Sequence, residues 1–166
     1  MSLIIRLGTE QDAEAIADIY NYYIEETCIT FELEPVSIEN RKEWIQQFKD
    51  DSPYQLIVAE EKGKVIGFAS SVRYHQRAAY YTSVMPSIYL RKGLSGKGIG
   101  KKLYTQLIER MEQNPDLHRA YALVSLPNPA SMALHEKLGF RKVGVLEEAG
   151  KKFGKFLNVQ ILERQL

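Results

Sequence analysis

A glycine-rich, basic turn past the middle of the chain has the residue types of an anion-binding site. Residues Ser95 to Lys101 read SGKGIGK, follow an apolar run that ends at Leu90, and open into a segment with helical spacing of its apolar residues. Glycine lets the backbone approach a ligand closely and exposes its N–H groups. The start of a helix adds free N–H groups and the positive end of the helix dipole. The turn therefore suits a phosphate or pyrophosphate, although the same composition also occurs in plain surface turns.

Spacing separates this turn from two common phosphate-binding loops. A Walker loop reads G-x-x-x-x-G-K-[ST], but Ser95 stands at its first glycine position and Lys102 at its Ser/Thr position. A dinucleotide-binding turn reads G-x-G-x-x-G, and counted from Gly98 its third glycine would be Leu103. Neither pattern fits, so the ligand must be identified from the rest of the chain.

The overall composition excludes several classes of protein. The chain has 166 residues, with 22 Lys and Arg against 21 Asp and Glu, which suits one domain over residues 1–166 and argues against a dedicated nucleic-acid binder. A lone cysteine, Cys28, excludes a disulfide within the chain and is expected as a small buried residue rather than a nucleophile. His75, His118 and His135 are not at metal-ligand spacing, so we expect no metal.

The first residues of the chain, MSLIIR, lack the basic start and long apolar core of a signal peptide. No later segment is apolar for long enough to predict a membrane span. We therefore expect a cytoplasmic protein that does not bind a membrane.

The elements that must position the turn predict a mixed α/β fold. Apolar runs predict strands over Leu3–Leu7, Tyr54–Glu60, Val65–Val72, Ser83–Leu90, Ala120–Ser125, Phe140–Leu146 and Phe156–Leu162. Helical spacing and polar caps predict four helices: one behind Thr9–Asp12, one after Ser37, one from Ile99 to about Asn114, and one that starts at Asn128 and ends at Gly139. We expect a mostly antiparallel, mixed sheet flanked by these helices.

The turn and five further segments resemble the GNAT acetyltransferases. The acetyl-CoA loop of that family reads R/Q-x-x-G-x-G/A after a strand, and Ser95–Gly100 matches it except that Ser95 replaces Arg or Gln. The narrower branch that the chain resembles contains the phosphinothricin and methionine sulfoximine acetyltransferases. The matching segments occur in order along the whole chain: Ile19–Asn21, Thr30–Pro35, Ser87–Leu90, the turn, Asn128–Ser131 with Leu134–Phe140, and Gly150–Val159.

This resemblance implies a fold and a cofactor site. The twisted mixed sheet is expected to split between the strand ending at Leu90 and the strand Ala120–Ser125, with acetyl-CoA in the split. Asn128 is also an ordinary helix N-cap, and the two roles are compatible. The residues expected to contact acetyl-CoA are Ile88, Tyr89 and Leu90 for the pantetheine arm, Ser95, Gly96, Lys97, Gly98, Ile99, Gly100 and Lys101 for the pyrophosphate, and Asn128 and Ser131 in a second contact region.

Transfer of an acetyl group to an amine needs a proton acceptor for the amine and benefits from a proton donor for the leaving thiolate. By resemblance, His135 stands where most GNATs have a tyrosine proposed as that donor, and a packing histidine is the alternative. Met85 stands where the branch has a glutamate base, and methionine accepts no proton. Glu32 and His75 are the candidate substitutes. Otherwise water relays the proton, the substrate arrives neutral, or activity has been lost.

The leading hypothesis is an acetyl-CoA-dependent N-acetyltransferase for a small amine, acting by direct transfer. Phe31, Tyr74, His75 and Met85 are the expected substrate-pocket residues. A non-catalytic acyl-CoA-binding protein is the alternative that Met85 favours, and an enzyme for a protein N-terminus or ribosomal amine is a third. The resemblance also implies a homodimer.

Overall fold

Polar caps start the helices where the sequence predicts them. In the computed structural model, which describes residues 3–166, Ser37 Oγ accepts the N–H of Asn40 at the start of α2 (Ile38–Ile45). Asn128 caps α4 (Pro129–Lys137) in the same way. The Thr9–Asp12 capping box forms a short 3-10 turn that leads into α1 (Ala13–Glu26). These side chains satisfy backbone N–H groups that a helix start leaves without partners.

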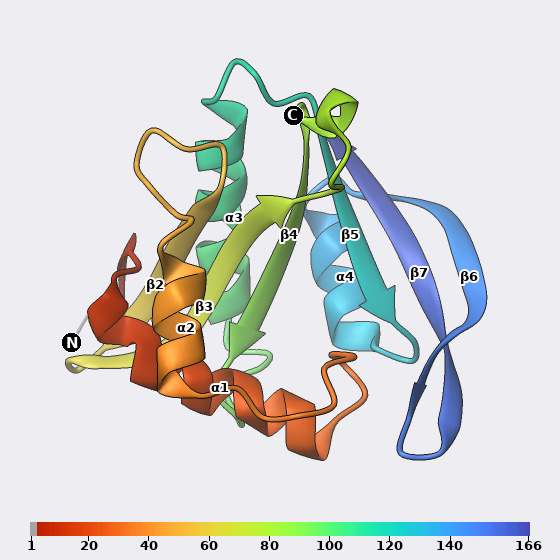
Figure 1. Ribbon diagram of the computed structural model, residues 1–166, viewed down its shortest axis with the longest axis horizontal. Helices are drawn as coiled ribbons and strands as arrows, with labels where there is room; N and C mark the ends of the chain where they lie inside the picture. Colours follow the sequence, from red (N-terminus) through yellow and green to blue (C-terminus); the bar gives the residue numbers. More distant parts are fainter. Residues whose placement is uncertain (1–2) are drawn as a thin grey trace.

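Seven strands form one sheet in the order β1-β2-β3-β4-β5-β7-β6 (Figure 1). Neighbouring strands are antiparallel except β4 and β5, which are parallel, so the predicted mixed and mostly antiparallel fold is confirmed. The strands are β1 (Ile4–Leu7), β2 (Gln55–Glu61), β3 (Lys64–Arg73), β4 (Ser83–Leu90), β5 (Arg119–Ser125), β6 (Arg141–Lys152) and β7 (Lys155–Gln165).

Two apolar layers pack on opposite faces of the sheet. On β2, Leu56 and Val58 pack with α1 and α2, whereas Ile57 and Ala59 pack in a second cluster with α3 (Ile99–Glu112). Alternate residues of a strand point to opposite faces, which explains this division. Among the described residues no helix is long and apolar enough to cross a membrane.

The sheet opens between β4 and β5. The two strands pair only at Ser83 with Arg119 and at Val84 with Ala120. Beyond these pairs they diverge, and Figure 1 shows β4 and β5 separating toward the end of the sheet where α4 begins. The split was expected between these two strands, and it leaves the last six residues of β4 without a partner strand on this side.

The last hairpin is longer than the sequence predicts. β6 was expected to end at Leu146, but it continues to Lys152, with a register shift against β7 between Leu146 and Gly150. The strands join through a tight turn at Phe153 and Gly154, which both have positive φ. β6 is an edge strand whose residues are mostly exposed, so it lacks the alternation of buried and exposed residues that marks a strand in a sequence.

Candidate active site

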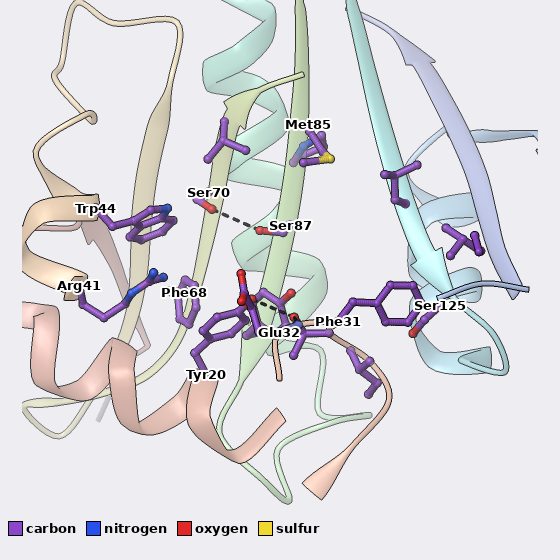
Figure 2. Close-up of a pocket in the computed structure, with 18 of the residues that line it drawn as sticks. Tyr20, Phe31, Glu32, Arg41, Trp44, Phe68, Ser70, Met85, Ser87 and Ser125 are labelled. Atoms are coloured by element: carbon purple, nitrogen blue, oxygen red, sulfur yellow. Dashed lines mark hydrogen bonds between the residues drawn. The ribbon is translucent and has the colours of Figure 1, made fainter. Parts of the chain in front are cut away.

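A pocket of about 710 Å³ lies beside the split (Figure 2). Two helices, the loop between them and five strands contribute to its wall. The lining residues are Tyr20, Ile29, Thr30, Phe31, Glu32, Arg41, Trp44, Phe68, Ser70, Val72, Met85, Pro86, Ser87, Tyr89, Leu123, Ser125, Leu146, Ala149 and Val159.

The loop between α1 and α2 brings Phe31 and Glu32 into this wall. The hydroxyl groups of Tyr20 and Thr30 lie 2.8 Å apart, and Lys152 Nζ donates to the carbonyl oxygen of Thr30 at 2.9 Å. Burial lowers the pKa of Lys152, whose ammonium group is held by backbone carbonyls. The loop is thus fixed at Thr30, next to the predicted pocket residue Phe31, whose ring lies against Gly150.

Strand β4 contributes Met85 to the wall and no carboxylate. Ser87 Oγ, two residues further along, lies 3.2 Å from Ser70 Oγ on β3. Glu32 is the acidic residue in the pocket lining. The arrangement therefore brings Phe31, Glu32 and Met85 together, as the sequence predicts, although the roles of these residues stay predictions.

Tyr74 and His75 are not among the residues that line this pocket, so their place in the substrate site stays a prediction. Tyr74 packs against Tyr121, with ring centroids 4.7 Å apart. The exposed ring of His75 packs on Tyr80, and its Nδ1 accepts the backbone N–H of Arg77 at 3.1 Å. These local contacts hold both side chains in or beside the segment after β3.

The glycine turn leads from β4 into the first turn of α3. Gly98 is the N-cap of α3 with a left-handed φ of 78°, and no side chain caps this helix start. Gly96 is also left-handed, at φ 81°, and a side chain at either position would meet no atom within 4 Å. Uncapped N–H groups, an open approach, and the exposed side chains of Ser95, Lys97 and Lys101 are what a bound phosphate needs.

A second, narrower pocket of about 50 Å³ adjoins the larger one between β4 and β5. Its wall includes the predicted cofactor residues Ile88, Tyr89, Asn128 and Ser131. It shares Pro86, Ser87 and Leu123 among others with the larger pocket, so the two meet in the split. Asn128 Oδ1 accepts the N–H of Ser131 at 3.2 Å, which confirms the N-cap and leaves the cofactor role a prediction.

His135 lies at the floor of the narrow pocket, where it is only 3% exposed. Its Nδ1 is 2.8 Å from the carbonyl oxygen of Ser131, which can only accept, so Nδ1 carries a proton. Burial lowers the pKa of His135, and the neutral ring accepts the hydroxyl of buried Tyr104 at Nε2 over 3.0 Å. A neutral imidazole with both nitrogens in hydrogen bonds is a weak acid. The role of His135 as proton donor to the thiolate therefore stays a prediction.

Tyr20, Arg41 and Trp44 are among the wall residues that were not predicted from the sequence. Arg41 and Trp44 stand three residues apart on α2, and this spacing places them on one face of a helix. The sequence does not tell which strands that face covers, and this is why the two residues were missed.

The chain is similar to known acetyltransferases along nearly its whole length. Residues 5–159 match the sequence profile of the acetyltransferase (GNAT) domain. The phosphinothricin N-acetyltransferase of Streptomyces coelicolor is 43% identical over 98% of this chain and 95% of its own. The L-methionine sulfoximine/L-methionine sulfone acetyltransferase of Salmonella typhimurium is 30% identical over 99% and 95%.

A solved structure has the same arrangement of strands and helices. The phosphinothricin acetyltransferase of Sinorhizobium meliloti, crystallised in complex with acetyl-CoA, superposes with a TM-score of 0.93. It is 31% identical and matches 100% of this chain and 89% of its own.

Proposed function

Because the chain belongs to the GNAT family of acetyltransferases, we propose that it moves the acetyl group of acetyl-CoA to the amine of a small amino acid analogue such as phosphinothricin or methionine sulfoximine. One observation carries the proposal: β4, which parts from β5 and lines the 710 Å³ pocket, runs directly into an uncapped glycine turn. Acetyl-CoA and the amine can therefore meet in the split from opposite sides.

The glycine turn has the features needed to hold the pyrophosphate of acetyl-CoA. In this proposal the backbone N–H groups of Gly96 to Gly100 and the side chains of Lys97 and Lys101 bind the phosphate oxygens. Residues Ile88 to Leu90 run beside the pantetheine arm, and the Tyr23 hydroxyl, which donates to the Leu90 carbonyl at 2.6 Å, fixes the end of that strand. When bound, acetyl-CoA supplies the activated acetyl thioester.

The backbone of β4 is suited to polarise the acetyl carbonyl. Past Val84, the backbone N–H groups of β4 that face β5 have no partner in that strand. An N–H group already aimed at the place where negative charge develops stabilises a tetrahedral intermediate without reorganisation. The split thus leaves donors free where the reaction requires them.

Glu32 is the residue we assign as proton acceptor for the amine. It lines the pocket, whereas the second candidate, His75, packs outside it on Tyr80. Met85, which lines the pocket from β4, has no atom that accepts a proton. Glu32 takes the proton directly or through one water, after which the neutral amine attacks the thioester carbonyl and the thiolate leaves.

Two other hypotheses have less support. The comparisons give no support to a non-catalytic acyl-CoA-binding protein, because relatives that match nearly the whole chain are acetyltransferases. An enzyme for a protein N-terminus has less support, because curated relatives that match nearly the whole chain are named for small amino acid analogues. A panel of peptide amines tests that possibility.

Release of free thiol from acetyl-CoA across a panel of amines tests the proposed function. We expect release with phosphinothricin, methionine sulfoximine or methionine sulfone at a rate well above that without amine. If acetyl-CoA binds by calorimetry but no amino acid analogue causes thiol release from it, the proposed amine substrate is wrong.

We also propose that residues 1–166 act as one domain, that the protein is a homodimer, and that it works in the cytoplasm, where acetyl-CoA is available. Support for the dimer comes from apolar side chains left exposed on the terminal hairpin, among them Val143, Val145, Phe153 and Phe156. β6 is also the edge of the sheet, with one side free of a strand partner.

A further inference from the structure

Arg41 is the basic residue in the lining of the large pocket, and aromatic rings hold its side chain in place (Figure 2). Its guanidinium carbon lies 4.7 Å from the ring centroid of Trp44 and 5.5 Å from that of Tyr20. Both distances allow a cation–π interaction. Nε and Nη2 also donate to Asn40 Oδ1 at 3.1 and 2.7 Å. The guanidinium group is thus positioned before any ligand arrives.

The charge of Arg41 has no ion-pair partner in the part of the chain from residue 3 to 166. Partial burial lowers the pKa of Arg41, and the neighbouring Tyr20 and Glu32 oppose that effect only in part. A cation taken partly out of water without a counter-charge is costly, and an anionic ligand group would offset the cost. The planar guanidinium group can bind two oxygens of such a group at once.

The place of Arg41 determines which end of a substrate it can reach. Trp44, which stacks with Arg41, packs on Phe68 of β3 with ring centroids 6.3 Å apart. Acetyl transfer takes place in the split on the far side of β4, and neighbouring strands lie roughly 5 Å apart. The α-carboxylate of an amino acid is separated from its amine by one carbon. If the amine lies in the split, a substrate group that reaches Arg41 must be several bonds away from that amine.

We propose that Arg41 determines substrate specificity by binding an oxyanion at the end of the substrate distant from the amine. This inference rests on the proposed function and deepens it. Phosphinothricin and methionine sulfone form a matched pair for testing this proposal, because they share the α-amino acid part and the chain length. At the distant end one has a charged methylphosphinate and the other a neutral methylsulfone of similar shape.

Calorimetric titration with these two compounds, in the presence of coenzyme A, tests Arg41 without any reaction. For Arg41→Gln we expect phosphinothricin to bind about 10- to 100-fold more weakly, because a charge-assisted pair is lost. Methionine sulfone should change by less than about threefold. Arg41→Lys keeps the charge but loses the planar fork, so it should give an intermediate loss for phosphinothricin alone.

A matched control is Lys42→Gln, which removes one positive charge from the same helix at an exposed position outside the pocket lining. It should leave both affinities unchanged. Equal affinities in Arg41→Gln and the unmodified protein, an equal loss for both compounds, or no binding of either compound would overturn the proposal. Binding that behaves as expected, but without thiol release on adding acetyl-CoA, would contradict the proposed function and leave the role of Arg41 standing.

Discussion

At the scale of single residues, the proposed proton acceptor is Glu32. Met85 has no basic atom, and Glu32 reaches the same pocket from the loop between α1 and α2. For Glu32→Gln we expect kcat to fall by about 100-fold or more at neutral pH, with acetyl-CoA binding retained. Steady-state kinetics with saturating acetyl-CoA measures this.

The control for that change is Glu34→Gln, two residues along the same loop and outside the pocket lining. It removes the same charge and should leave kcat within about twofold. Unchanged turnover in Glu32→Gln would show that water or a neutral substrate replaces the base.

His135 makes the stability of the protein depend on pH. Its pKa in the folded state lies below the unfolded value because the ring is buried. Above the unfolded pKa both states hold the neutral ring. As pH falls through that value toward the folded pKa, the unfolded state takes up a proton that the folded state resists, and stability is lost. We expect Tm to decline over this range and His135→Gln to flatten that part of the profile. Identical profiles would contradict this account of the buried ring.

At the scale of elements, the start of α3 combines a left-handed N-cap with an open approach. Gly98→Val forces a branched side chain into φ 78° and into the space in front of the helix N–H groups, so acetyl-CoA affinity should fall at least tenfold by calorimetry. Gly63→Val is matched to it, since Gly63 has φ 73° and equally open surroundings in the β2–β3 turn. It should lower Tm without changing acetyl-CoA affinity, and an equal loss in both variants would refute the assignment of the turn.

Gly150 on β6 lies against the ring of Phe31, which lines the pocket. A methyl group at Gly150 would overlap the Phe31 ring, whereas one at Gly144 on the same strand would meet no atom within 4 Å. We expect Gly150→Ala to displace the ring and raise KM for the amine several-fold, with acetyl-CoA affinity retained. Gly144→Ala should behave as the unmodified protein. The two KM values, measured side by side, decide whether Phe31 shapes the pocket.

The sequence predicts those elements that are determined by residues close together in the chain. β4 has the predicted limits, and Ser37 and Asn128 cap helices as expected, because a buried run and a cap are set by neighbouring residues. The extent of β6 and the pocket role of Arg41 depend on pairing and packing between distant segments. No pattern within one segment records such contacts.

At the scale of the whole molecule, the edge of the sheet is expected to be the site of self-association. Val145 on β6 is 45% exposed and Phe156 on β7 is 60% exposed. Light scattering after gel filtration should give a mass of twice the 19.0 kDa chain, and Phe156→Glu should shift it toward one chain. A monomeric mass for the unmodified protein at all concentrations would exclude the dimer.

At the same scale, the parting of β4 and β5 is the central feature of the proposed function, in which acetyl-CoA and the amine meet between the two strands. The most direct measurement is mass spectrometry of phosphinothricin incubated with the protein and acetyl-CoA. We predict one acetyl group on the amine for each molecule of free coenzyme A formed. Coenzyme A released without acetylated amine, or no product with any amino acid analogue, would contradict it.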